Sequence, residues 1–286
     1  YGQWGEMLES VMADNPDLRF ILLGGDLVDQ GNSMEEWQQF FAAGQQVFRK
    51  LPLMPAVGNH DDTEFFRQFF LLPRNGPEGY QDTIYSFDYG NCHLTVLNSN
   101  CMGIPGIGDY DKIAGWLQED LQRSQQLWKV LVFHHPPYPV VQDWRAEVLQ
   151  KHWVPIFEEN GVDIVFVGHQ HVYMRTRPLG GGQVQPEGEG IVYVMGNAGT
   201  KHYGPGPGYE YMATQLARVE NYQIIDINGG ILTMTAKNGQ GNVIDSFGLV
   251  KETVGDSPSA RWLMGLMRFL PNLFRGTIQL SPNGIN

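Results

Sequence analysis

Polar side chains able to bind a metal follow four apolar segments of the sequence. Each segment is short, as a buried strand would be, and runs directly into a loop that holds Asp, Asn or His. The loops are Gly24-Gly25-Asp26, Gly58-Asn59-His60-Asp61-Asp62, His134-His135-Pro136-Pro137 and Gly168-His169-Gln170-His171. Because sites in open α/β sheets form at the carboxyl ends of strands, we expect these loops to converge. The sequence therefore predicts one site built from four loops.

The side chains of these loops suit a transition metal. Asp26 offers a carboxylate and Asn59 a carbonyl oxygen, while His134, His169 and His171 offer imidazoles. Mixed oxygen and nitrogen ligation favours Mn, Fe or Zn over Ca²⁺, which prefers oxygen alone. His169 and His171 lie two residues apart, so in extended backbone both rings would point to the same side. Each loop taken singly could be only a turn or a helix cap, and it is their joint occurrence that indicates a metal site.

The segments between the loops predict an α/β fold. The opening residues have apolar side chains at helical spacing as far as Asn15-Pro16. A second helix is expected from Ser33, an N-cap type with Glu36 three residues later, to Arg49. Further helices are expected near 113–124 and 146–159, a hairpin over 84–99, and strands at 20–23, 53–57, 129–133, 163–167, 191–195, 223–227 and 231–236.

Composition narrows the possible partners. The chain has 286 residues and a formal net charge of −12, which argues against broad binding to nucleic acid or to anionic membranes. Phosphate substrates stay possible because bound metal ions can reverse the local field. The two cysteines, Cys92 and Cys101, are too few for a four-cysteine zinc site. They could pair across a short loop, but a buried strand thiol and a separate loop thiol is the simpler interpretation.

The pattern changes past about residue 250. Residues 1–250 are expected to form one catalytic domain, and residues 251–286 an apolar tail or helix. The apolar segment 262–270 is too short to span a bilayer. It could pack back onto the domain, or residues 261–274 could contact a membrane or a partner.

The four loops resemble motifs two to five of the calcineurin-like metallophosphoesterases. The resemblance lies in Gly25-Asp26-Leu27-Val28-Asp29-Gln30-Gly31, Gly58-Asn59-His60-Asp61, His134-His135-Pro136 and Gly168-His169-Gln170-His171. The His-x-Pro-x-Tyr sequence from His134 to Tyr138 and the β-rich C-terminal region are similar to the purple-acid-phosphatase-like branch. The resemblance covers roughly residues 1–250 and implies a four-layer αββα sandwich with metal ions at the strand ends.

The resemblance also implies a role for each loop residue. Asp26 would bridge two divalent or trivalent metal ions. Asn59, His134 and His169 would complete the second metal site, and His171 would belong to the first. His134 is preferred to His135 because the family places this ligand two residues before the first proline.

Two departures from the family pattern bear on the metals. The first motif, Asp-x-His on the opening strand, has no counterpart, because the sequence begins in the helix that normally follows it. We expect an N-terminally incomplete sequence; the alternatives are a substitute segment, or a one-metal or inactive relative. Asp29 stands where purple acid phosphatases carry a tyrosinate ligand, so a ferric tyrosinate site is not expected and Asp29 is expected to support the site or shape a turn.

The expected reaction is phosphate-ester hydrolysis by a metal-bridging hydroxide at a dinuclear site. Two metal ions would lower the pKa of a bridging water and draw in the phosphate oxygens. His60 would contact the phosphate or protonate the leaving oxygen. Aromatic and histidine side chains just beyond the metal loops are candidates for substrate contacts, although each could serve packing alone: Tyr138, Trp144, Tyr173, His202 and Tyr203.

Other functions stay open on the sequence alone. One is a non-hydrolytic metal-binding or scaffold protein that lacks the first metal site. Another is a phosphodiesterase that acts on nucleotides or lipids. The resemblance to secreted phosphatases and the low count of 19 Lys and Arg residues favour an extracytoplasmic location, periplasmic or secreted.

Overall fold

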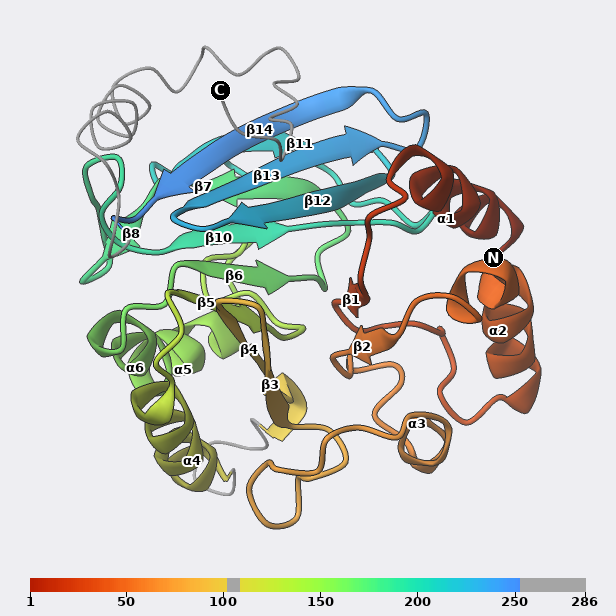
Figure 1. Cartoon of the computed structure of the whole chain (residues 1–286), viewed down its shortest axis with the longest axis horizontal. Helices are drawn as coiled ribbons and strands as arrows, with labels where there is room; N and C mark the ends of the chain where they lie inside the picture. Colours follow the sequence, from red (N-terminus) through yellow and green to blue (C-terminus); the bar gives the residue numbers. More distant parts are fainter. Residues whose placement is uncertain (102–108, 253–286) are drawn as a thin grey trace, which may run out of the picture.

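A seven-stranded mixed sheet forms the centre of the molecule. The computed structural model describes residues 1–101 and 109–252, so the predicted apolar segment in 261–274 lies outside it. The strand order is β11-β7-β10-β6-β5-β4-β3 (Figure 1). Strands β4, β5, β6 and β10 run parallel, while β3, β7 and β11 pair antiparallel to their neighbours. The strands are β3 (Tyr85–Tyr89), β4 (Cys92–Val96), β5 (Trp128–Val132), β6 (Ile164–Val167), β7 (Tyr173–Thr176), β10 (Val192–Met195) and β11 (Met212–Leu216).

Three helices cover one face of this sheet. They are α4 (Tyr110–Arg123), α5 (Trp144–His152) and α6 (Val154–Glu159). Alternate residues of β5 show how the strands serve two cores, because Leu131 packs with these helices while Val130 packs on the other face. This alternation follows from the two-residue period of a strand.

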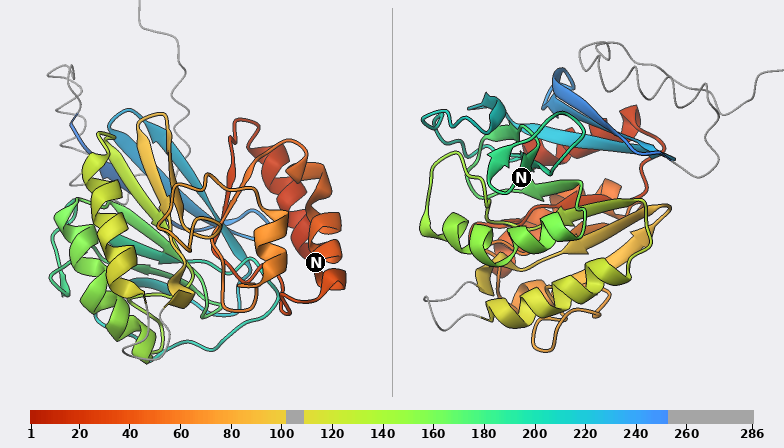
Figure 2. Two further views of the ribbon diagram at one scale, coloured as in Figure 1. Left: turned by 90° about the horizontal axis from the view of Figure 1, so that it is seen from below. Right: turned by 90° about the vertical axis from the view of Figure 1, so that its left-hand side faces the viewer.

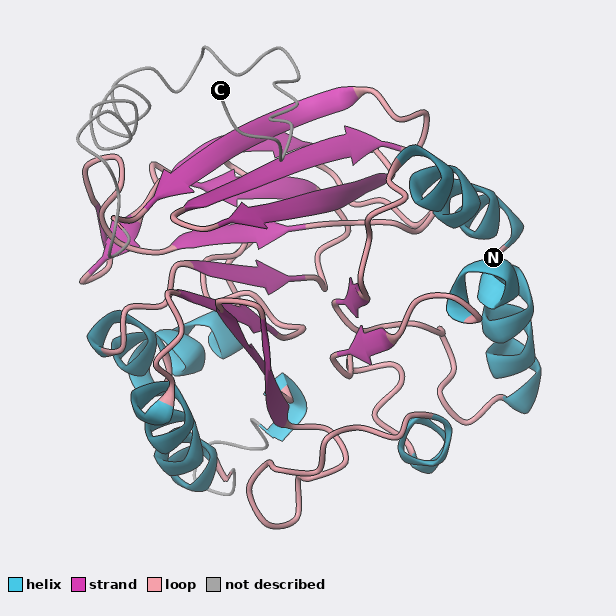
Figure 3. Cartoon of the chain, viewed as in Figure 1, coloured by secondary structure: helices cyan, strands magenta, loops and turns pink. Residues whose placement is uncertain are grey.

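A second layer of strands packs on the opposite face. It contains the antiparallel sheet β12 (Asn221–Asn228), β13 (Ile231–Asn238) and β14 (Val243–Val250), and the parallel pair β1 (Ile21–Leu23) and β2 (Leu53–Pro55). Outside β1 and β2 lie α1 (Gly2–Asp14), α2 (Met34–Phe48) and α3 (Glu64–Phe69). Figures 2 and 3 show the strands in the middle with helices on both outer sides. The α/β fold with helix, sheet, sheet and helix layers is confirmed.

Small elements complete the described chain. A 3-10 turn, η1 (Ser99–Cys101), follows β4, and a short hairpin joins β8 (Leu179–Gly180) to β9 (Gln183–Val184). Within the described part of the chain, no helix is both long and apolar enough to cross a membrane. Cys92 and Cys101 are free thiols, so the simpler interpretation of the two cysteines is confirmed.

Local signals in the sequence set several element boundaries. The Ser33 side chain accepts a hydrogen bond from the Glu36 backbone N–H at the start of α2, as its type predicts. The single helix predicted over 146–159 is wrong, because the chain breaks at Trp153 into α5 and α6. Pro155 explains the break, since proline has no backbone N–H to continue the hydrogen bonds of α5 and is well placed in the first turn of a new helix.

Candidate metal centre

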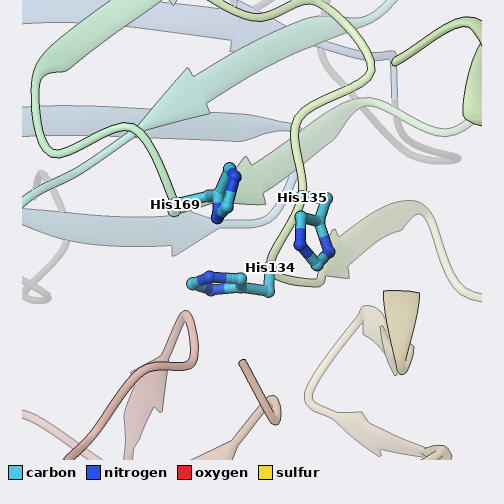
Figure 4. A group of neighbouring side chains, drawn as sticks. All are labelled: His134, His135 and His169. Atoms are coloured by element: carbon cyan, nitrogen blue, oxygen red, sulfur yellow. The ribbon is translucent and has the colours of Figure 1, made fainter. Parts of the chain in front are cut away.

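The four predicted loops meet at one edge of the two sheet layers. Asp26 follows β1, Asn59 follows β2, His134 follows β5 and His169 follows β6, each just beyond the strand's carboxyl end. Figure 4 shows the rings of His134, His135 and His169 gathered in one group. Potential ligand atoms of these three histidines all lie within 4.8 Å of one another. The predicted convergence is therefore present.

Glycine allows the loops after β1 and β2 to cross at very short range. A Cβ on Gly58 would collide with the Asp26 backbone nitrogen and carboxylate, and a Cβ on Gly25 would lie 2.7 Å from the backbone nitrogen of Gly58. The backbone is also held in a sparsely populated region, with φ of 55° at Asp26, 74° at His169 and 46° at His171. Left-handed conformation at non-glycine residues is costly and collects at functional sites.

His134 and Asp26 present two electron-pair donors to the same point. Nδ1 of His134 lies 2.8 Å from the carbonyl oxygen of Gly24, which can only accept, so Nδ1 carries the hydrogen. In the neutral ring, Nε2 then holds a lone pair 3.0 Å from Oδ2 of Asp26. The Nε2 atom is buried and is without a hydrogen-bond partner. Only a proton or a cation between these two atoms makes the contact favourable.

The contact between His134 and Asp26 shifts the pKa of both residues. Burial would lower the pKa of His134, but the Asp26 carboxylate opposes it and the net shift is upward. Burial would likewise raise the pKa of Asp26, but His134 and the His60 backbone N–H hold that pKa well below its usual range. Both shifts show that the point between Nε2 of His134 and Oδ2 of Asp26 attracts positive charge, as a metal site does.

The other two histidines of the group are neutral and ready to bind a metal ion. Burial, reinforced by His134, lowers the pKa of His135 to about 2 and that of His169 to about 4. Nδ1 of His169 lies 3.0 Å from Oδ1 of Asn59, another predicted ligand. Nδ1 of His135 lies 2.9 Å from Oγ of Ser99, which leaves its buried Nε2 without a partner. Orphaned buried nitrogens among neutral imidazoles fit a transition metal.

His135 is closer to the site than the sequence comparison with the family implied. Its ring centroid is 4.5 Å from that of His169 and 5.0 Å from that of His134. His134 is nevertheless the histidine that faces Asp26. The preference for His134 as the ligand stays a prediction, with His135 now placed in the same group.

His60 lies at the open side of the site with one nitrogen already engaged. Its Nδ1 lies 2.7 Å from the backbone carbonyl oxygen of Asp29, so Nδ1 carries a hydrogen and Nε2 is left for another partner. The Asp29 side chain is mostly exposed and its Oδ1 lies 3.4 Å from the same nitrogen. Asp29 thus orients His60, as expected of a supporting residue.

Asp61 is an organising residue that the sequence analysis did not single out. Its fully buried carboxylate accepts hydrogen bonds from the backbone N–H groups of Leu27 and Gly58, each at 2.6 Å. Burial raises the pKa of Asp61 to about 6 in spite of these bonds. One carboxylate therefore ties the Asp26 loop to the Asn59 loop. Its place at the end of Gly-Asn-His-Asp was a signal, but nothing in the sequence shows which backbone groups it would reach.

The last predicted ligand, His171, sits under an exposed tyrosine. The ring centroids of His171 and Tyr203 are 4.8 Å apart, and the Tyr203 backbone N–H donates to the carbonyl of His171 at 3.3 Å. Asn197, just beyond β10, hydrogen-bonds to the carbonyl of Lys201 and lies 3.2 Å from Nδ1 of His202. The chain after β10 thus brings His202 and Tyr203 to this side of the histidines.

Two of the predicted substrate residues do not reach the surface of the site. Tyr173 is fully buried between the sheets and donates its hydroxyl to Asp245 at 2.7 Å, so a substrate role for it is not retained. Tyr138 is 5% exposed and packs against Tyr193 and Tyr211. Apolar packing decides both positions, whereas Trp144 stays 44% exposed.

The fold and the histidine group are typical of the metallophosphoesterase family, and comparison with known families agrees. The family model described as Calcineurin-like phosphoesterase matches residues 1–173. The chain belongs to this family.

Its similarities point to the purple-acid-phosphatase-like branch. Over 197 residues it is 27% identical to purple acid phosphatase 18 of Arabidopsis thaliana, covering 63% of this chain and 43% of that protein. Over 285 residues it is 25% identical to "Probable inactive purple acid phosphatase 24" of the same plant, covering 85% of this chain and 45% of that protein. A solved purple acid phosphatase from yellow lupin (Lupinus luteus) seeds shares the fold, with a TM-score of 0.72, 17% identity, and coverage of 88% of this chain and 52% of that one. The chain thus spans less than half the length of these two Arabidopsis relatives.

Proposed function

We propose that this chain hydrolyses phosphate esters with metal ions held by Asp26, Asn59, His134, His169 and His171. The observation that supports it most strongly is the buried contact between Nε2 of His134 and Oδ2 of Asp26, 3.0 Å apart and without hydrogen-bond geometry. Such a contact needs positive charge between the two atoms, which a metal ion would supply in place of a proton. Two ions, with Asp26 between them, are part of this proposal, as is their identity as Mn, Fe or Zn.

The bound ions would act as Lewis acids toward the phosphate oxygens and supply a nucleophilic water near neutral pH. The chain's own contribution is to hold charge and direct protons. Asp26 keeps its negative charge because its pKa is depressed. His135 and His169 stay uncharged, so they add no repulsion to a metal cation.

His60 is proposed to protonate the leaving oxygen. Its Nδ1 is fixed on the carbonyl of Asp29 at 2.7 Å, which aims Nε2 away from that loop. A partly exposed ring can exchange protons with solvent, which a buried one such as His134 cannot do as readily. His202 and Tyr203 are proposed to contact the substrate, because they lie beside His171 and are not sealed in the core.

The test is metal content by elemental analysis together with hydrolysis of an aryl phosphate. Asn59→Ala is expected to lose metal and to lower kcat/KM by about 10²-fold or more, the usual cost of removing one charge-stabilising group. Asn242→Ala is the matched control, since Asn242 is exposed on the turn between β13 and β14. A wild type that binds no metal and turns over neither mono- nor diesters would instead support the non-hydrolytic, scaffold function.

A further inference from the structure

Two loops beyond the metal ligands are fastened around the histidine group. Gln170, between His169 and His171, accepts hydrogen bonds from the backbone N–H groups of Val140 and Val141 at 2.7 and 3.0 Å. Its side-chain amide also donates to the carbonyl of Val141 at 2.7 Å. The chain after β5 is therefore attached directly to the His169–His171 loop.

The chain after β10 packs against the loop after β5. A side chain on Gly206 would overlap the carbonyl oxygen of Val140, so the two backbones touch there. The Tyr211 hydroxyl also donates to the carbonyl of Pro139. Residues carried by these two loops are consequently held in place relative to the histidines.

Each loop brings one cation to the histidine group. Arg145, in the first turn of α5, stands four residues after Val141, whose backbone N–H is bound by Gln170 between His169 and His171. Lys201, on the loop after β10, stands two residues before Tyr203, whose ring centroid lies 4.8 Å from that of His171. These two positive charges stand beside the candidate ligands of a chain whose net charge is −12.

Only one of the two cations has an acidic partner among the described residues. Nη1 of Arg145 lies 3.9 Å from Oδ2 of Asp143, whose other oxygen, Oδ1, accepts the backbone N–H groups of Arg145 and Ala146 as the cap of α5. Lys201 is exposed and has no ion pair in the part of the chain that the structure describes. A single long contact leaves the other guanidinium donors of Arg145, and the ammonium of Lys201, open to an anion in solution.

An aromatic ring backs each cation. The Arg145 guanidinium lies 4.8 Å from the ring centroid of Trp144, and the Lys201 ammonium lies 5.9 Å from that of Tyr203. Such contacts restrict a long side chain without consuming its charge. Trp144 and Tyr203 are 44% and 46% exposed, so each ring also presents a free surface beside its cation.

We propose that Arg145 and Lys201 bind a second phosphoryl group that is not cleaved, so the site prefers substrates with two or more linked phosphoryl groups. A guanidinium can engage such a group with two hydrogen bonds and an ammonium as a point charge. The inference rests on the proposed phosphoesterase function and adds its substrate class.

The experiment compares two anions that cannot be hydrolysed. Methylphosphonate has one phosphonate group, and methylenediphosphonate has two joined by carbon. Calorimetry on the protein as purified, with its metal content measured, gives both dissociation constants and their ratio. We expect the wild type to bind the diphosphonate about tenfold or more tightly, and Arg145→Gln or Lys201→Gln to reduce that ratio by about tenfold.

Two further variants separate this effect from loss of fold or of general charge. Arg123→Gln removes an exposed arginine of α4, paired with Glu119, and should keep the wild-type ratio. Arg145→Lys keeps the charge but not the paired donors, and should give an intermediate ratio. An unchanged ratio in both glutamine variants, or an Arg123→Gln loss equal to theirs, would overturn the inference.

The same measurements keep the two proposals apart. A wild type that hydrolyses an aryl phosphate but binds both phosphonates equally retains the phosphoesterase function and overturns the second-phosphoryl site. A wild type that neither hydrolyses the ester nor binds either phosphonate overturns both. If the inference holds, kcat/KM for inorganic pyrophosphate and for a nucleoside diphosphate shows whether a base on the exposed rings adds to the selectivity.

Discussion

Replacing Gly58 by alanine is expected to damage the centre by steric contact alone. The added Cβ would overlap the backbone nitrogen and the carboxylate oxygen Oδ1 of Asp26, and its Cγ would lie 2.8 Å away. The backbone at Gly58 has no positive φ, so alanine can adopt its conformation and the cost is one of space. Overpacking of this kind costs about 1–3 kcal/mol. Since the displaced group is the proposed bridging carboxylate, metal binding should suffer as well.

The matched control is Gly115→Ala in α4. A Cβ at Gly115 meets no atom within 4 Å, and alanine is favoured over glycine in a helix by about 1 kcal/mol. Denaturant unfolding should therefore place the two alanine variants on opposite sides of the wild type, about 2–4 kcal/mol apart. Elemental analysis should show metal loss in the Gly58 variant alone. If Gly58→Ala unfolds at the wild-type midpoint and retains its metal, the close crossing of the two loops is wrong.

Three smaller changes test other parts of the structure. Tyr173→Phe removes a hydrogen bond of 2.7 Å to Oδ2 of Asp245, an oxygen that still accepts from Nε of Arg175. We therefore expect a loss of about 0.5–1.5 kcal/mol in unfolding free energy with an unaltered KM for aryl phosphate, and a raised KM would restore its substrate role. His93 is buried, which would lower its pKa, but Asp120 and Asp88 reverse this and the net shift is upward. The stabilisation by these ion pairs is complete below about pH 6.5, the pKa of histidine in the unfolded chain, and is lost as pH rises through the pKa in the folded chain. His93→Gln should therefore lower the unfolding free energy in urea more at pH 5.5 than at pH 9. An equal loss at both pH values would contradict the pairing of His93 with the two carboxylates. Ser33→Ala removes the cap of α2 and should lower the unfolding free energy by about 1 kcal/mol in the same assay.

The order of strands and helices was predictable because it depends on local patterns. The short apolar runs ending in Gly, Asp, Asn or His marked β1, β2, β5 and β6, and the Tyr89–Asn91 turn marked the β3–β4 hairpin. The order of the strands within the sheet could not be predicted, since it depends on which strands pair over long distances in the sequence. The break at Trp153 was missed because an apolar helical period continues across it, although Pro155 was the available signal.

The sequence was enough to select the candidate ligands, which stay a prediction, but not to predict how the loops around them are held. Each candidate ligand follows a short apolar run in the sequence, and the order of these runs resembles that of the family. The residues concerned are Asp26, Asn59, His134 and His169. Their supports depend on loop geometry instead. The buried Asp61 reaches Leu27 across 34 residues, and no periodicity encodes such a contact.

Burial divides the candidate metal centre into a closed side and an open side. Residues on the closed side can bind an ion only, and residues on the open side can also contact a substrate. His134 and His135 are each 1% exposed, so their nitrogens can serve an ion but cannot meet a substrate. Asn59 is exposed and His60 partly so, and both come from the loop after β2. In the proposed reaction, a phosphate ester would therefore approach from the side of Asn59 and His60. The proposed second phosphoryl group would lie toward the loops after β5 and β10, because those loops carry Arg145 and Lys201.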